Sequence, residues 1–220
     1  MFIHGEIYLP RIPLITEETL TPAQRLVYDK ILAGPRGVVV GPLRAVLHSA
    51  ELADRWQALG EFLRFKSCLS LALRELAIIA AGRHWNSEVE WLIHAQLALE
   101  AGICKDVIAA IREAEAPQFQ DPDEFAVYEL ARELLHYGQA SDATYDRVRQ
   151  RFGTVAIVEL TALVGYYTMV AMTLNAHEVP LPKATSELAV LPVRRTEGKL
   201  TLPTRLAVAQ VVTPAPADSL

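Results

Sequence analysis

Apolar residues recur at helical spacing along most of the chain, and short segments rich in glycine, proline or polar residues separate them. This pattern predicts helices at about residues 22–33, 43–48, 50–66, 70–85, 87–101, 104–115, 122–137, 142–152 and 154–178. Residues that commonly cap the first turn of a helix precede four of these segments: Thr21, Ser70, Asp121 and Ser141. Because no alternation typical of strands occurs before residue 180, the sequence predicts an all-α body.

The character of the chain changes twice, which divides it into three parts. Residues 1–20 are typical of an extended arm, and residues 21–179 of one helical domain. Residues 180–220 hold six of the thirteen prolines and one glycine, so we expect an extended, proline-rich tail. Since this tail is too apolar to be simply solvated, we expect it to lie along the domain or along a neighbouring subunit.

The segment of residues 155–174 is about as long and apolar as a segment that spans a bilayer. Glu159 and several threonines interrupt it, and a carboxylate in mid-membrane is costly. We therefore expect a buried helix and no membrane partner. A helix that is apolar on all sides must be covered on all sides, so we also expect a stable homo-oligomer, at least a dimer.

The composition of the chain argues against several classes of function. The chain has 220 residues and a net charge of −5, and it offers no basic excess with which to bind nucleic acid. Its two cysteines, Cys68 and Cys104, form neither a CxxC motif nor a zinc-binding set, which is typical of a reducing cytosol. The N-terminus lacks the apolar run of a signal peptide. These features predict a cytoplasmic protein that uses no metal.

Three ionisable residues stand out in two predicted helices that meet at residues 84–87. Glu75 lies about ten residues before this turn and His94 about eight after it. With a rise of about 1.5 Å per residue, the two lie at similar heights in an antiparallel hairpin. Glu90 precedes His94 by one helical turn. Two carboxylates around one imidazole are an arrangement suited to proton transfer.

Each of these residues also has a structural interpretation. Ser87 and Glu90 have the spacing of a capping box, in which Glu90 serves the start of its helix. His94, at the margin of a buried helix face, fits a structural histidine whose polar atoms are satisfied locally. Glu75 fits a buried ion pair with Arg83 or another arginine.

The spacing Glu-(x)11-Ser-x-x-Glu-Trp-x-x-His, which runs from Glu75 to His94, resembles the carboxymuconolactone decarboxylase family, a relative of alkyl hydroperoxidase D. The resemblance covers about residues 20–180 and implies an alkyl hydroperoxidase D-like helical bundle, which forms trimers or hexamers. In the peroxidase branch, cysteines stand where this chain has Ser87 and Glu90. A thiol peroxidase needs a thiolate and a resolving thiol, so that activity is disfavoured here.

The resemblance implies a cofactor-independent lyase of the decarboxylase type, acting on a small organic acid or lactone of the kind met in aromatic compound catabolism. His94 would donate the proton, and Glu90 and Glu75 would orient it. No metal or organic cofactor is needed when a conjugated lactone is itself the electron sink. The alternatives are an isomerase, hydratase or hydrolase on the same scaffold, and a non-catalytic oligomeric binding protein.

Such a site must also hold the substrate. An arginine would bind the carboxylate, and Arg83 is the nearest candidate, although it also fits a salt bridge. The further candidates for the pocket wall are Ser87, Trp91, Tyr166, Tyr167 and Asn175. Core packing is the alternative role for Trp91 and for the candidates on the last helix.

Overall fold

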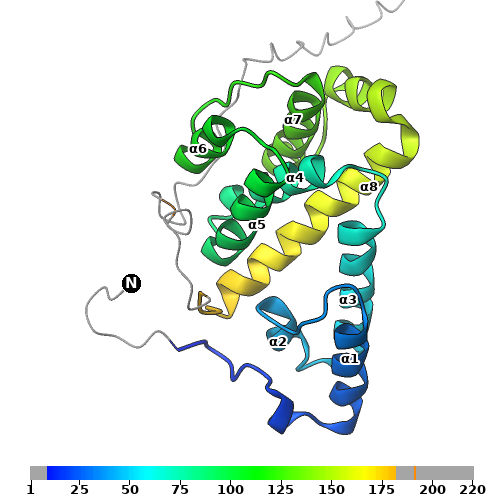
Figure 1. Ribbon diagram of the computed structural model, residues 1–220, viewed down its shortest axis with the longest axis vertical. Helices are drawn as coiled ribbons and strands as arrows, with labels where there is room; N and C mark the ends of the chain where they lie inside the picture. Colours follow the sequence, from blue (N-terminus) through cyan, green and yellow to red (C-terminus); the bar gives the residue numbers. More distant parts are fainter. Residues whose placement is uncertain (1–8, 182–190, 192–220) are drawn as a thin grey trace, which may run out of the picture.

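The computed structural model describes residues 9–181 and residue 191, and within these residues all regular structure is helical (Figure 1). A short 3-10 turn, Glu17–Thr19, precedes the main helices. These are α1 (Pro22–Ala33), α2 (Pro42–Val46), α3 (Ala50–Phe65), α4 (Leu71–His84), α5 (Glu88–Glu100), α6 (Lys105–Glu113), α7 (Pro122–Tyr137) and α8 (Asp142–Ala176). The predicted all-α fold class is confirmed, and helix ends lie within about two residues of their expected positions.

Side-chain caps explain where several helices begin. The Thr21 hydroxyl accepts a hydrogen bond from the backbone of Gln24, whose own side chain accepts one from the Thr21 backbone. Ser70 and Ser141 accept from the backbone three residues ahead in the same way. These bonds satisfy N–H groups that have no partner within the first turn of a helix.

Helix α4 is the centre of the bundle. Nearly every residue from Leu73 to Arg83 is buried, and the helix packs against α5, α7 and α8. Such a helix, apolar on every side, must be enclosed by other elements. The polar exceptions on it, Glu75 and Arg83, therefore require partners inside the protein.

Helix α8 links the two groups of helices. In Figure 1 it runs diagonally between the group of α4 to α7 and the group of α1 to α3, and it contacts α2, α3, α4 and α7. Gly153, with φ 85° and ψ 175°, breaks its helical path. Only glycine adopts this backbone conformation readily, and the break divides α8 where the sequence predicts two helices, 142–152 and 154–178.

By length and composition alone, α8 is apolar enough to cross a membrane, and half of its most apolar window is buried inside the chain. Glu159, in that segment, accepts a hydrogen bond of 2.8 Å from the backbone N–H of Cys68. This carboxylate is thus held at a loop of the same chain.

The predicted arm contacts the end of the bundle. The backbone N–H of Arg11 donates to the carbonyl of His177 at 3.0 Å, and its guanidinium pairs with Glu178. The backbone N–H of Ile15 donates to the carbonyl of Arg44 at 3.2 Å. The predicted tail, residues 180–220, lies almost entirely outside the described residues.

Candidate proton-transfer site

The antiparallel hairpin of α4 and α5 brings Glu75 and His94 together. His94 Nδ1 lies 2.6 Å from Glu75 Oε2, and both side chains are at most 5% exposed. A carboxylate at this distance fixes the ring, because the Nδ1–H group donates to it and leaves Nε2 for chemistry. The partner of Glu75 is thus a histidine, and no arginine within residues 9–181 forms an ion pair with it.

Glu90 lies on the other side of the imidazole. Its Oε2 is 3.7 Å from His94 Nε2, which is too far for a hydrogen bond, and this buried oxygen has no hydrogen-bond partner. Burial raises the pKa of Glu90 from 4.5 to about 7. The charges of His94, Arg64 and Arg36 act against this rise, and the charge of Glu75 adds to it.

This arrangement provides a proton reservoir at neutral pH. A carboxyl group with a pKa of about 7 gains and loses its proton under ordinary conditions. His94 Nε2 faces that group while Glu75 holds the opposite ring nitrogen. The three side chains can therefore deliver a proton and recover it without a metal or an organic cofactor.

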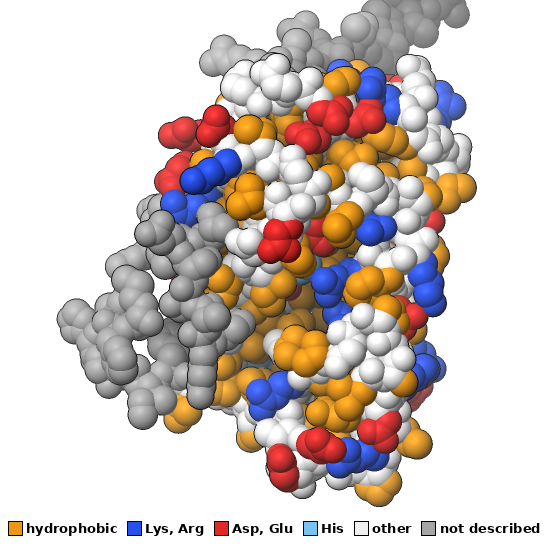
Figure 2. All heavy atoms as spheres, viewed as in Figure 1, with side chains coloured by type: hydrophobic (Ala, Val, Ile, Leu, Met, Phe, Trp, Pro, Cys, Tyr) orange, Lys and Arg blue, Asp and Glu red, His pale blue; other side chains and the backbone are white. Residues whose placement is uncertain are grey.

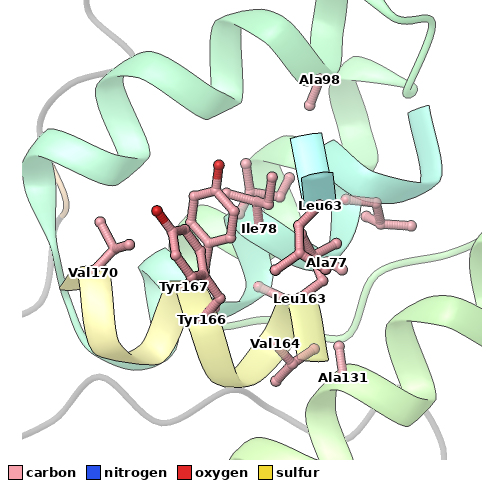
Figure 3. Close-up of a cluster of buried hydrophobic side chains, with 14 of the residues drawn as sticks. Leu63, Ala77, Ile78, Ala98, Ala131, Leu163, Val164, Tyr166, Tyr167 and Val170 are labelled. Carbon is pink, nitrogen blue, oxygen red and sulfur yellow. The ribbon is translucent and has the colours of Figure 1, made fainter. Parts of the chain in front are cut away.

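Two tyrosines of α8 lie near the imidazole, and one of them contacts it. The Tyr167 ring lies edge-on to His94, with centroids 5.0 Å apart, and the Tyr166 ring lies 5.5 Å from that of Tyr167. Both rings leave α8 side by side (Figure 3). Burial raises the pKa of both hydroxyls, that of Tyr166 to about 12, so both remain protonated and able to donate hydrogen bonds.

The predicted capping box is not formed. Ser87 stands at the start of α5, but its side chain makes no capping bond and its hydroxyl is buried without a hydrogen-bond partner. Glu90 instead turns toward His94. Trp91 is fully buried in the core, which agrees with the packing interpretation.

Arg83 points toward α6. Its Nε donates to the carbonyl of Arg112 at 2.7 Å and its Nη1 to Asn86 Oδ1 at 3.4 Å. Burial lowers the pKa of this guanidinium, which is fully enclosed. These two bonds hold Arg83 toward α6 and the α4–α5 turn, so its described contacts give no support to the expectation that it holds a substrate carboxylate beside His94.

Asn175 also makes a structural contact. Its Nδ2 donates to the carbonyl of Trp85 at 2.8 Å and so ties the α4–α5 turn to the end of α8. The neighbouring indole N–H of Trp85 donates to Thr168 at 3.1 Å. These two bonds fix the hairpin that carries His94 against the helix that carries the tyrosines.

Two arginines near this site were missed by sequence reasoning. Arg36 lies in the loop between α1 and α2, and Arg64 lies near the end of α3. The charges of both lower the pKa values of Glu90 and Tyr166. A usable signal was Gly60, because a glycine inside a predicted helix often marks a close approach of another group.

The face of the molecule seen in Figure 2 is hollowed near its centre, in the region that lies between α3 and α8 in Figure 1. Hydrophobic atoms form the floor of this hollow, and Lys or Arg side chains border it. Among the described residues, no group of three or more His, Cys, Asp or Glu side chains is suited to a metal ion. Both cysteines are free and exposed.

Residues 50–133 match the family model for the Carboxymuconolactone decarboxylase family, and this span includes Glu75, Glu90 and His94. The chain also resembles solved structures, each at low sequence identity. An uncharacterized peroxidase-related protein from Ralstonia eutropha, with an alkylhydroperoxidase AhpD core, aligns with a TM-score of 0.64 and 13% identity. The alignment covers 79% of this chain and 93% of that one.

A peroxidase-related protein from Silicibacter aligns with a TM-score of 0.65 and 13% identity, over 83% of this chain and 96% of that one. A debrominase solved with 2,3,4-tribromopyrrole aligns with a TM-score of 0.59 and 11% identity, over 77% and 90%. At such identities these matches show the shared fold. No curated protein matches the chain.

Proposed function

We propose, for a chain whose residues 50–133 match the model of the carboxymuconolactone decarboxylase family, a cofactor-independent lyase activity on a small organic acid or lactone. The family and the debrominase of the same fold support a catalytic role on this scaffold. The observation that carries the proposal is the buried series Glu75–His94–Glu90, in which a carboxyl with a pKa of about 7 faces an oriented imidazole.

The reaction needs little beyond these groups. A γ-lactone carboxylate loses CO2, and the electrons of the broken C–C bond flow through a double bond into the lactone carbonyl. The resulting dienolate then takes a proton on carbon. His94 donates that proton from Nε2 as an imidazolium that Glu75 stabilises, which leaves a neutral ring, and Glu90 then returns a proton to Nε2.

Tyrosine hydroxyls near His94 can donate a hydrogen bond to the negative charge that develops on the dienolate oxygen. Tyr167 lies against His94 and Tyr166 lies beside it, and both hydroxyls stay protonated at neutral pH because of their burial. A neutral donor in a water-poor site stabilises an enolate oxygen more strongly than it does in bulk water. We assign this role to the hydroxyl of Tyr167, the ring that contacts His94.

A thiol peroxidase activity is not proposed. Ser87 and Glu90 stand where the peroxidase branch has cysteines, and the only two thiols of the chain are exposed cysteines outside the hairpin. Burial and Glu159 raise the pKa of the Cys68 thiol, which further disfavours its reactive thiolate form.

Two rivals use the same site. His94 acting as a general base would make the protein an isomerase, a hydratase or a hydrolase. A site that binds acids without transforming them would make it a binding protein. Glu90 faces His94, and its carboxyl has a pKa of about 7. This arrangement favours proton transfer over binding alone.

The test is to incubate the protein with 4-carboxymuconolactone and related lactone acids in D2O. We expect CO2 release together with one deuteron on the product carbon that the dienolate presents. Isomerisation or ring opening without CO2 would select the first rival. Binding by calorimetry with no chemical change in any of these acids would contradict an enzymatic function.

A further inference from the structure

One guanidinium nitrogen of the partly exposed Arg36 lies buried and without a hydrogen-bond partner beside the proposed site. Arg36 Nη2 is inaccessible to solvent and makes no hydrogen bond among the described residues. Glu61 reaches the same loop, at Gly34, but its carboxylate pairs with Lys66 at 2.7 Å. A buried N–H group without an acceptor is costly, so this nitrogen of a positively charged side chain favours the binding of an anion.

Gly60 of α3 creates the space in which this group meets Tyr166. A Cβ atom on Gly60 would overlap the Tyr166 hydroxyl and would lie 3.1 Å from Arg36 Nη2. The guanidinium and the hydroxyl therefore converge over the same bare backbone. Glycine inside a helix costs about 1 kcal/mol relative to alanine, and this convergence is a reason for its presence.

A series of edge-to-face ring contacts connects this point with the imidazole. Trp56 lies edge-on to Tyr166 at 5.7 Å, Tyr166 to Tyr167 at 5.5 Å, and Tyr167 to His94 at 5.0 Å. A flat, unsaturated molecule packs well on such rings. Such a molecule would extend from the Arg36 guanidinium at one end toward His94 at the other.

A second positive charge acts on the same interior. The Arg64 guanidinium lies over the ring of Phe65 at 5.2 Å, and, in the part of the chain that the structure describes, no carboxylate forms an ion pair with it. Its charge lowers the pKa values of Glu90, Tyr166 and Tyr167, so it lies near the groups that line the site. The site thus has net positive character at one side and proton-transfer groups at the other.

We propose that Arg36 and the Tyr166 hydroxyl bind the carboxylate of a planar, unsaturated acid, with Arg64 supplying additional positive charge and Gly60 keeping the subsite open. This inference rests on the proposed function and names its substrate class, since the reacting carbon then lies toward His94. It also replaces Arg83, which faces α6, as the group that recognises the carboxylate.

The test measures binding without turnover, by titration calorimetry with benzoate and with neutral benzamide as a probe of equal shape. We expect benzoate to bind more tightly than benzamide. Arg36→Gln should weaken benzoate binding about 10- to 100-fold, because a charge-assisted hydrogen bond is lost, and should leave benzamide binding unchanged. Arg36→Lys should give an intermediate affinity, since it keeps the charge but loses the forked geometry.

The matched control is Arg55→Gln. Arg55 lies on α3, the helix that also carries Gly60, and its side chain is 70% exposed and pairs with Glu51. Its loss should therefore leave benzoate affinity unchanged. Gly60→Ala should weaken benzoate binding as Arg36→Gln does, because the added methyl group displaces the Tyr166 hydroxyl. Unchanged circular dichroism and melting curves identify the variants that are folded.

Equal benzoate affinity in folded Arg36→Gln and in the wild type would overturn this proposal, as would equal affinity for benzoate and benzamide or no benzoate binding at about 10 mM. A failure of the proposed catalytic function can be distinguished from a failure of this binding subsite. Folded His94→Gln should still bind benzoate, so a failure of catalysis with intact Arg36-dependent binding leaves the subsite standing.

Discussion

Replacing Glu90 by Gln should stabilise the protein at alkaline pH and reduce its activity. In the folded protein, burial raises the pKa of this carboxyl from 4.5 to about 7. Above pH 7 the folded state must therefore hold a charge in a site that disfavours it. Glutamine has the same shape without the charge, and the Glu90 oxygen that faces His94 has no hydrogen bond to lose.

The magnitude follows from the two pKa values. One pKa unit corresponds to about 1.4 kcal/mol, so a rise from 4.5 to about 7 corresponds to about 3 kcal/mol of lost stability once the group is ionised. Below pH 4.5 the carboxyl is protonated in both the folded and unfolded states, and this loss vanishes. As the pH increases from 4.5 to 7, the unfolded state releases its proton first, so the stability that this group contributes falls.

One opposing effect is smaller. Glu90 lies in the first turn of α5, where a negative charge interacts favourably with the helix dipole. That interaction is worth about 0.3–1 kcal/mol, so the burial effect dominates. Between pH 5 and 8.5, the advantage of Glu90→Gln over the wild type should thus grow by about 2–3 kcal/mol.

The assay is urea unfolding of the wild type and the variant at several pH values, at constant ionic strength. Glu100→Gln is the control, because Glu100 lies exposed on the same helix and its carboxylate accepts a hydrogen bond from the neighbouring Gln96 side chain. A stability difference between Glu90→Gln and the wild type that stays constant within about 0.5 kcal/mol across this range would refute the reasoning.

Two further predictions concern the thiols and the assembly. The double variant Cys68→Ser, Cys104→Ser should keep full activity, because both thiols are exposed outside the site. Peroxide turnover by the wild type that disappears in this variant would contradict the conclusion that the cysteines have no catalytic role. Val155 and Val158 of α8 are 63% and 62% exposed in a single chain, so sedimentation at micromolar concentration should show a dimer or a larger homo-oligomer, and a monomer would contradict this expectation.

The helices and the central pair of the site follow from local signals. Thr21, Ser70 and Ser141 cap their helices because their hydroxyls reach backbone N–H groups within the same turn. Glu75 and His94 meet because residues equidistant from a short turn lie at equal heights in a hairpin. Both arguments need only the geometry of one or two neighbouring helices.

The remaining features depend on packing between distant segments. The orientation of Arg83 is set by the position of α6, and the Glu90 carboxyl, which a capping box would use at the start of α5, turns toward the imidazole. Arg36 reaches the site from a loop about forty residues before Glu75, through a space that Gly60 leaves open. Helical periodicity carries no information on such contacts, since they depend on how α1 to α3 pack against α8.

The central claim is that His94 transfers the proton, and the turnover number of His94→Gln tests it most directly. Glutamine can still donate a hydrogen bond to Glu75 but does not titrate near neutral pH, so the fold should persist. On a lactone acid that the wild type converts, we expect turnover to fall by about 10²–10⁴-fold, whereas His48→Gln, at an exposed histidine bound to the carbonyl of Pro13, should retain the wild-type rate. Wild-type turnover in folded His94→Gln would contradict the account and return Glu75 and Glu90 to structural roles.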